Sequence, residues 1–451
     1  MSVNDPARKS VWKQAFLVFA IAFFAQSLTY AVIKWHNPAE VIDGDTPSYF
    51  ACAEDFRKTG KFDSAACSVR TPVYPLLVAV TGSSAERPSP VIRLQHFFAA
   101  AVAALFAFFL LPFLGPRASC VWGVLFSLDA LILRYTNTVM TEMPFLFFWA
   151  LSWALLYRAL ATGRWFLPLF VCGLLQAAAV LTRPLALFWP VAQGILLLVF
   201  LFSSRGTNRR RFVVNVIVVF LYGAAALGIP QLWAYHNWKA HGYWSVARVG
   251  MDVLHHKSAT ILTTDLGVSL DQAHEILNER FHEKGVRGGI SDAERDKLYR
   301  EVLLETLWRH PAGFVRSAIR SARRVLFRGA VPEFAAKGQP GRTLHCVLNY
   351  LNVGWNVLLG CFALYFFLPH RRDPLLRSDA VKKFWLAISV LSILYFTLMV
   401  TPHGKARYRF PIVPAIYFLA VLGFHELRET RRARYNLKCQ SHDLRAVSSA
   451  G

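Results

Sequence analysis

Long apolar stretches alternate with short polar segments along most of the chain. As helices, stretches of roughly 17 to 25 mostly apolar residues are long enough to cross about 30 Å of hydrocarbon. Such stretches fall at 14–33, 91–113, 118–134, 143–161, 165–182, 185–203, 212–233, 344–368, 384–401 and 410–425. The pattern predicts an α-helical polytopic membrane protein with about ten transmembrane helices. The weakest predictions among them are the short spans at 118–134 and 165–182.

Basic residues give the expected orientation of these spans. An alternating topology puts four groups of cations on one side: Arg8, Lys9 and Lys13; Arg205, Arg209, Arg210 and Arg211; Arg371, Arg372, Arg377, Lys382 and Lys383; and Arg428, Arg431, Arg432 and Arg434. The positive-inside rule makes that side cytoplasmic. We therefore expect a multi-pass protein of a bacterial inner membrane with both termini in the cytoplasm. The apolar run at 11–33 exceeds a signal-peptide core and predicts a retained first span.

The topology divides the chain into three parts. Residues 1–233 form an N-terminal membrane module with a first external segment at about 34–90. Residues 234–343 form a long external segment that the pattern predicts to be mostly helical. Residues 344–451 form a C-terminal membrane module with a basic cytoplasmic tail.

Two helices are expected within the long external segment. Asp292 is placed to cap the first, which ends before His310-Pro311. In the second, Val315, Ile319, Ala322 and Leu326 share one side, while Arg316, Arg320, Arg323 and Arg324 fill the other. That amphipathic basic pattern is typical of a helix lying on an anionic membrane surface, and it favours lipid anchoring over direct substrate contact.

Composition narrows the class of protein. Of the 451 residues 55% are hydrophobic, and the formal net charge is +23. The cations lie between apolar runs and not in one stripe, so no nucleic-acid partner is expected. The 7 cysteines cannot all pair internally and show no metal-ligand spacing, so no metal site is predicted. Cys52 and Cys67 share the first external segment, in an oxidising compartment, and are expected to form a disulfide.

The first candidate for chemistry follows the first span directly. Asp43 and Asp45 precede Pro47, which is typical of the first position of a helix, so both carboxylates are expected at the outer lipid–water boundary. Asp45 has two interpretations. It is a helix cap, or it is a general base that takes a proton from an acceptor hydroxyl or amine. The residues alone leave both open.

Other charged residues mark further external boundaries. Arg70 precedes a Pro-rich return toward the membrane that includes Tyr74, and it either grips a phosphate or snorkels at the interface. Glu142 opens a span from outside, a position that the helix dipole also favours. Arg183 stands at another external turn.

A cationic turn lies near the C-terminus. His403, Lys405, Arg407 and Arg409 crowd a short external turn, against the positive-inside trend. This density of charge predicts an anionic ligand such as a phosphate or diphosphate headgroup.

Taken in order, these motifs resemble the class C glycosyltransferases. They are Asp45 with Tyr49, the Arg70–Pro75 stretch, Thr141-Glu142, the 181–184 stretch ending in Arg183-Pro184, and the 407–412 stretch. More narrowly they resemble the bacterial protein-mannosyltransferase and lipid A aminoarabinose-transferase relatives of the family 39 type. No one motif is specific, but their order is, over about 41–414.

The resemblance implies a polyprenyl-phosphate-linked sugar as donor and an inverting transfer to an acceptor glycan, lipid or protein on the periplasmic face. It puts the catalytic acid of the first external segment on Asp45. Arg70, Lys405, Arg407 and Arg409 are then candidates to bind the donor phosphate, and Tyr49, Tyr74, Arg183 and His403 to position donor or acceptor. No cofactor is expected, although a divalent cation stays open because some relatives use one.

One departure affects the second carboxylate. The aminoarabinose-transferase pattern has an acid before a Lys-Pro-Pro-Leu motif, whereas Val69 precedes Arg70 here. Asp43, Glu142 and Asp63 are the candidates, with Asp63 ranked last. A lipid or small-solute transporter without transferase activity is the alternative function. It would need ionisable groups within spans, where the sequence has only Asp129 with the polar Gln176, Gln193 and Asn215.

Overall fold

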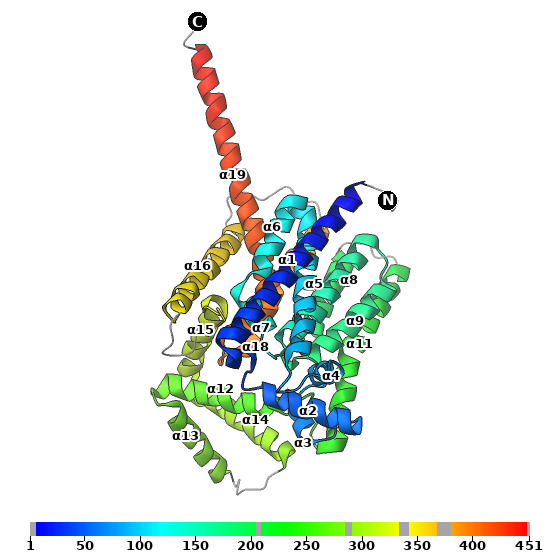
Figure 1. Ribbon diagram of the computed structural model, residues 1–451, viewed down its shortest axis with the longest axis vertical. Helices are drawn as coiled ribbons and strands as arrows, with labels where there is room; N and C mark the ends of the chain where they lie inside the picture. The colour runs from blue at the N-terminus through cyan, green and yellow to red at the C-terminus, as the bar shows by residue number, and fades with distance from the viewer. Residues whose placement is uncertain (1–5, 204–208, 285–290, 333–341, 368–379, 449–451) are drawn as a thin grey trace.

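The described chain is almost entirely helical. A computed structural model describes residues 6–203, 209–284, 291–332, 342–367 and 380–448. Figure 1 shows a bundle of long helices with shorter helices gathered at one end. The bundle corresponds to the predicted spans and the shorter helices to the predicted external segments.

Eight helical segments among the described residues are long and apolar enough to cross a membrane. The helices that form them are α1 (Pro6–His36), α5 (Ser89–Leu114), α8 (Glu142–Thr162), α10 (Trp189–Ser203), α11 (Arg209–His241), α16 (Arg342–Phe367), α18 (Ala380–Val400) and α19 (Val413–Ser448). Each covers one predicted span, so the predicted fold class of an α-helical polytopic membrane protein is confirmed. The span predicted at 212–233 is longer than expected, because α11 continues to His241.

The two weakest predicted spans differ from simple crossings. The stretch at 118–134 is broken into α6 (Pro116–Ser127) and α7 (Ala130–Thr136), which are bent by 55°. Asp129 lies at the break and caps α7, since its carboxylate accepts the Leu131 N–H at 2.9 Å. It also accepts the Tyr417 hydroxyl at 3.0 Å. The other stretch forms α9 (Phe166–Val180), which has only 15 residues.

The first external segment folds into η1 (Pro38–Val41), α2 (Thr46–Thr59), α3 (Ala65–Ser68) and α4 (Val73–Val80). The predicted disulfide between Cys52 of α2 and Cys67 of α3 is confirmed. It ties α3 to α2, so the chain returns to the start of α2 at Arg70. The four other cysteines whose side chains are described are free thiols.

The long external segment contains α12 (Val249–Leu266), α13 (Leu270–Glu283), α14 (Asp292–Arg309) and α15 (Pro311–Phe327). The expected cap of α14 was wrong by one residue, because Ser291 and Glu294 form a capping box there. On α15, Val315 and Ile319 are exposed as a lipid-facing side requires. The buried side carries small residues, Gly313, Ser317, Ser321 and Val325.

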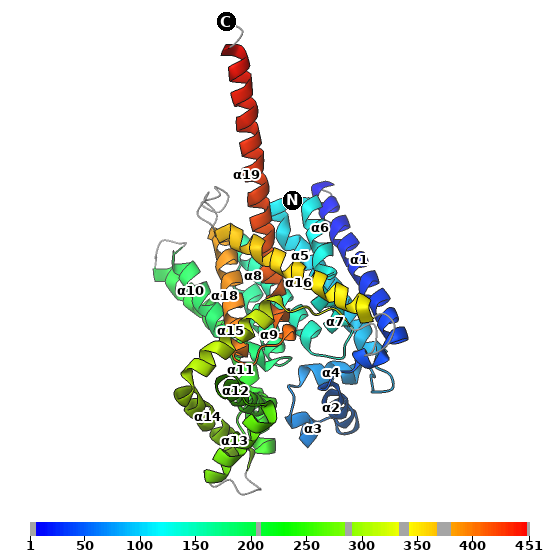
Figure 2. The same ribbon diagram turned by 90° about the vertical axis from the view of Figure 1, so that its left-hand side faces the viewer.

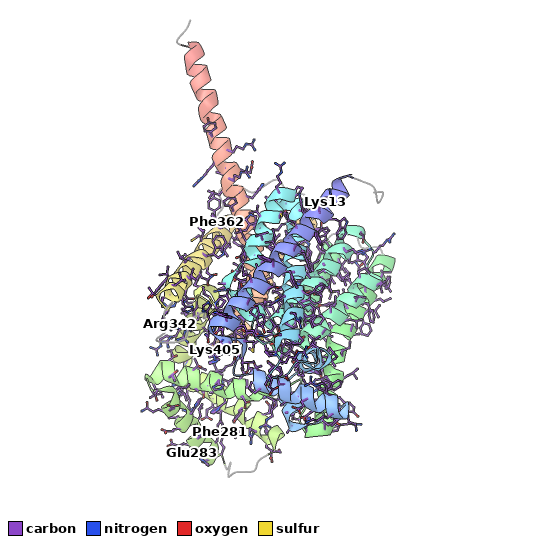
Figure 3. All side chains as sticks on the ribbon, viewed as in Figure 1. Lys13, Phe281, Glu283, Arg342, Phe362 and Lys405 are labelled. Atoms are coloured by element: carbon purple, nitrogen blue, oxygen red, sulfur yellow. A yellow bond between two sulfur atoms is a disulfide. The ribbon has the colours of Figure 1, made fainter. Side chains whose placement is uncertain are left out.

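Figures 1 and 2 show that α1 begins at the end of the bundle opposite α12, α13 and α14, and that α19 leaves the bundle at the same end and projects well beyond it. Figure 3 shows the same separation between Lys13 and the pair Phe281 and Glu283. Both termini thus share one end. That this end is cytoplasmic stays a prediction, and Arg205, Arg371, Arg372 and Arg377 of its basic clusters lie outside the described residues.

Candidate functional site

Asp45 is the N-cap residue of α2, yet its side chain makes no cap hydrogen bond. Its carboxylate accepts from Arg70 Nη2 at 2.8 Å and from Arg407 Nη1 at 3.1 Å. Thr46 holds the turn instead, accepting the Asp43 N–H at 2.9 Å and donating to the Val139 carbonyl at 3.0 Å. The capping interpretation of Asp45 is therefore wrong, because its carboxylate bonds two arginines and not the backbone of α2.

The charge state of Asp45 follows from its neighbours. Burial would raise the pKa of its carboxyl, but the charges of Arg70 and Arg407 and their hydrogen bonds outweigh burial and lower it. Asp45 is therefore a carboxylate at neutral pH. Its side chain is 28% exposed, so solvent or a ligand can still reach it.

Arg70 is held from two sides. Its Nε donates to the Ser48 hydroxyl at 2.8 Å, and its guanidinium lies 5.0 Å from the centre of the Tyr49 ring. Tyr49 packs edge-on against Tyr74, whose hydroxyl donates to Gln95 at 2.8 Å. Tyr74 is fully buried behind Tyr49, so it supports the site from below and does not line it.

Glu142 and Arg183 form a second ion pair close to the first. Glu142 at the start of α8 is fully buried, and Arg183 precedes η2 (Pro184–Ala186). The buried pair joins the start of α8 to the turn that follows α9. Glu142 therefore neutralises a cation here, in addition to facing the α8 dipole.

These groups line one cavity of about 290 Å³, which we call the Asp45 cavity. Its cations are Arg70, Arg183, Lys257 and Arg407, and its carboxylates are Asp45 and Glu142, which leaves an excess of two positive charges. Apolar residues of three elements complete the wall: Leu185, Val249, Val253, Met399 and Val400. The cavity thus combines a cationic floor with apolar sides.

The turn before α19 supplies His403 and Lys405 to this region, and η3 (Ala406–Ile412), which follows them, supplies Arg407. His403 lines the Asp45 cavity, meets the Thr260 hydroxyl at 3.2 Å and stacks on His256. Burial and the nearby Lys405 lower the pKa of His403 to about 4, so its ring is neutral at pH 7. Figure 3 places Lys405 between the bundle and the external helices.

Arg409 lines neither the Asp45 cavity nor a site shared with the other predicted phosphate-binding cations. The geometry gives no support to the prediction that Arg409 binds the donor phosphate. The Arg409 side chain is 2% exposed, and Nη1 donates to the carbonyls of Val325, Leu326 and Arg328 at 3.0 to 3.4 Å. These carbonyls lie at the C-terminal end of α15, where helix carbonyls lack intrahelical partners. Arg409 therefore fastens η3 to α15, a role that side-chain direction decides and spacing does not reveal.

A larger cavity of about 570 Å³ lies beside the first, and we call it the basic cavity. It shares His403 and Arg407 with the Asp45 cavity, and Asp43 faces it. Its other cations are Arg134, Arg320, Arg324, Arg328 and Lys405. Arg320 and Arg324, which the sequence assigned to lipid anchoring, therefore also line an internal space.

Two residues of the region were missed from sequence. Lys257 lines the Asp45 cavity and donates to the Met399 carbonyl at 3.0 Å, and burial lowers its pKa. Ser48 holds Arg70. Ser48 lies beside Asp45 and Tyr49 in the sequence, whereas none of the motifs named from the sequence lies near Lys257. Asp63 lies elsewhere, with its half-exposed side chain 3.0 Å from His236.

The residues around Asp45 do not fit a divalent cation. Both carboxylate oxygens of Asp45 face guanidinium groups, and Glu142 is paired with Arg183. In the described part of the chain, no three metal-ligand side chains lie together. A cation at this position would meet more positive than negative charge.

The polar residues within the spans have hydrogen-bond partners in the bundle, on a neighbouring helix or, for Gln193, on the same helix. Gln176 donates to Ser152 at 2.8 Å, Gln193 accepts from Trp189 at 2.9 Å, and Asn215 lies 3.5 Å from the Leu201 carbonyl. With Asp129 bonded as described above, each of the four has a structural partner. None of these contacts outlines a translocation path.

Comparison with known proteins was made by sequence and by fold. No family model and no curated protein matches the sequence. Among solved structures, the oligosaccharyltransferase AglB from Archaeoglobus fulgidus matches 94% of this chain with 12% identity and a TM-score of 0.50, both in its apo form and in complex with an inhibitory peptide and a dolichol-phosphate. The present chain spans 52% of that protein.

A second solved structure matches less well. ArnT from Cupriavidus metallidurans in the apo state covers 90% of this chain and 76% of its own, at 13% identity with a TM-score of 0.36. The likeness to the archaeal enzyme is a likeness of fold. The chain thus shares the multi-span helical fold of the archaeal oligosaccharyltransferase.

Proposed function

We propose that this protein is an integral membrane glycosyltransferase that moves a sugar from a polyprenyl-phosphate donor to an acceptor at the outer face of the membrane. The observation that carries the proposal is Asp45, a carboxylate that is free of helix capping and is held between Arg70 and Arg407 in a cavity with apolar sides. The shared fold and the dolichol-phosphate bound to the archaeal structure support it.

The Asp45 cavity suits an amphiphilic donor. A prenyl chain would pack against Val249, Val253 and Met399, while its phosphate meets the excess cationic charge. Arg407 lines this cavity, and its buried Nε has no hydrogen-bond partner among the described residues. Arg70 uses only Nε and Nη2 in its bonds to Ser48 and Asp45. Lys405 lines the basic cavity and not the Asp45 cavity, so it is assigned to the basic cavity and not to this phosphate.

The reaction is a single displacement. The acceptor oxygen or nitrogen forms a bond to the anomeric carbon as the bond from that carbon to the phosphate oxygen breaks, which inverts the configuration. Asp45 receives the acceptor's proton. Arg70 and Arg407 stabilise the negative charge that develops on the leaving phosphate. Glu142 positions Arg183 by pairing with it, and no step requires a metal ion.

The test is transfer from a lipid carrier. Purified protein in detergent should move radiolabelled sugar from a polyprenyl-phosphate donor to envelope acceptors without ATP or an ion gradient. The Asp45→Ala variant should be inactive, while the Asp63→Ala variant, remote from the cavity, should keep its rate. If the carrier lipid crosses vesicle membranes with its sugar still attached, the transporter alternative replaces this proposal.

A further inference from the structure

The basic cavity contains more positive charge than the proposed reaction uses. Arg320, Arg324 and Arg328 come from α15 and its C-terminal end, and Lys405 comes from the turn before η3. Among the described residues, none of these four forms an ion pair with a carboxylate. Asp43 is the one carboxylate in the described lining.

The cations are crowded against one another. Arg320, Arg324 and Arg328 follow each other at four-residue intervals, so consecutive turns of α15 bring them to one side. Burial and the neighbouring charges of Arg320, Arg328 and Arg323 lower the pKa of Arg324. Uncompensated like charges at this spacing destabilise a helix, so an arrangement of this kind is stabilised when an anion enters.

A polar group within the cavity wall also lacks a partner. Ser321 is 2% exposed and lines the cavity, and its hydroxyl has no hydrogen-bond partner among the described residues. Gly404 lets the chain pass close to it, because a Cβ at that position would lie 2.8 Å from the Ser321 carbonyl. A buried hydroxyl of this kind is stabilised by a ligand oxygen.

Resting on the proposed function, we propose that the basic cavity binds a phosphate-bearing part of the acceptor. The two cavities meet at Arg407 and His403, so a ligand held by Arg320, Arg324 and Lys405 would have its neighbouring hydroxyl near the sugar donor. The donor itself fits this cavity less well, because the lining is mostly polar and offers a prenyl chain little apolar surface.

The cavity recognises phosphate chemistry, and two sources could supply it: a phosphorylated lipid headgroup or a phosphorylated glycan. Both are polyanions with several acceptor oxygens, which suit guanidinium donors in bidentate geometry. The acceptor phosphate and the donor phosphate would bind in different cavities. Arg70 lines only the Asp45 cavity, and Arg320 lines only the basic cavity.

The experiment measures two probes on the full chain in neutral detergent. Radiolabelled inorganic pyrophosphate reports on the basic cavity, and farnesyl phosphate reports on the Asp45 cavity. The double variant Arg320→Gln with Arg324→Gln should bind pyrophosphate about tenfold more weakly or worse, because two charge-assisted contacts are lost. It should bind farnesyl phosphate within about twofold of the parent, whereas Arg70→Gln should show the reverse pattern.

Arg323→Gln is the matched control. Arg323 neighbours Arg324 on the same helix and does not line the cavity, so its loss changes net charge alone and should leave both affinities unchanged. Its thermal unfolding gives the reference for the folding of the double variant. Displacement of pyrophosphate by phosphatidic acid in mixed micelles would identify a lipid source, and displacement by a sugar bisphosphate would identify a glycan.

Three results overturn the proposal. They are pyrophosphate binding that is absent in the parent, binding that is unchanged in the double variant, and loss of both probes together in that variant, which would make the cavity part of the donor site. Failure of the proposed function looks different. Farnesyl phosphate would then not bind the parent, while pyrophosphate would still depend on Arg320 and Arg324.

Discussion

The cations of the two neighbouring cavities differ in whether they are paired with carboxylates. In the Asp45 cavity, Arg70 and Arg407 share one carboxylate and Arg183 has another, so each of these guanidinium groups is held in place before a ligand arrives. In the basic cavity, Arg320 and Arg324 have no carboxylate partner among the described residues.

The difference indicates two kinds of binding. Guanidinium groups that are already held in place need little reorganisation, so little free energy is lost when they stabilise the charge that develops during a reaction. Unpaired, more exposed cations attract an anion over a longer range but gain less from each contact, because solvent and salt screen them. The first arrangement suits chemistry, and the second suits capture of a ligand.

The largest expected effect separates Asp45 from Asp43, the carboxylates that face the two cavities. Asp45→Asn removes the proton acceptor, and loss of general-base catalysis costs on the order of 100-fold to 10,000-fold in rate. Asp43→Asn should change the rate far less, because no side-chain bond to Asp43 is needed in the proposed reaction. Initial rates of sugar transfer by purified protein test both.

Two outcomes would contradict this assignment. If Asp45→Asn kept the parental rate while Asp43→Asn lost it, the base would be the carboxylate of the basic cavity. If both variants kept full activity, neither carboxylate of the first external segment would be catalytic. Thermal unfolding of both variants serves as the control for misfolding.

Arg407 and Arg409, two residues apart, should fail in different ways. Arg407→Gln removes a contact to Asp45 and to the proposed phosphate, so the donor KM should rise roughly tenfold to a hundredfold, as for a charge-assisted bond of about 1.5 to 3 kcal/mol. Arg409→Gln should lower stability by on the order of 2 kcal/mol, because three carbonyls at the end of α15 lose a charged donor.

Donor titrations and thermal unfolding of the same two variants measure these effects. Arg409→Gln should retain a near-parental donor KM in the fraction that stays folded. An unchanged Tm together with a raised donor KM in Arg409→Gln would return Arg409 to the phosphate site.

Chelation should have a smaller effect still. Because the oxygens of Asp45 are taken by guanidinium groups, treatment with EDTA followed by removal of the chelator should leave the transfer rate within about twofold. Adding Mg²⁺ or Mn²⁺ to the EDTA-treated Asp45→Asn variant should not restore its transfer rate. A rate that collapses with EDTA and recovers with one of these ions would show that a metal displaces the arginines.

The smallest expected effect is on stability at mildly acid pH. The pKa values of His255 and His403 are about 4 in the folded protein, mainly because of burial, against an ordinary value of 6.5. The unfolded chain therefore binds more protons than the folded one between pH 6.5 and 4, and stability should fall as pH falls through that window.

Thermal unfolding at pH 7 and pH 5 measures this slope. His403→Gln should flatten it, because one of the two half-buried rings no longer needs to be kept neutral. A variant whose Tm falls as steeply as that of the parent would show that His403 is not responsible. His255→Gln then serves as the second test of the cluster.

The order of spans was predictable because the hydrocarbon core demands long apolar helices whatever the rest of the chain does. The break within 118–134 was not predicted, and one of the two hydrogen bonds that Asp129 accepts there comes from the Tyr417 hydroxyl, far away in sequence. The disulfide was predictable because Cys52 and Cys67 share one segment between spans that was expected to lie in an oxidising compartment. Its consequence, the return of Arg70 to the start of α2, required the folded segment.

For the site, the sequence by itself determined which residue types stand in the polar segments between the spans, including Asp45, Arg70 and Arg407. Only the tertiary structure decided which of them meet. Residues 45 and 407 come together because α2, α4 and η3 pack at one end of the bundle, a contact that no local pattern encodes. The tertiary structure also decided that Arg409 points inward and that Arg320 faces a cavity. The rotation of a helix is fixed by packing against its neighbours and not by the spacing of residues in the sequence alone.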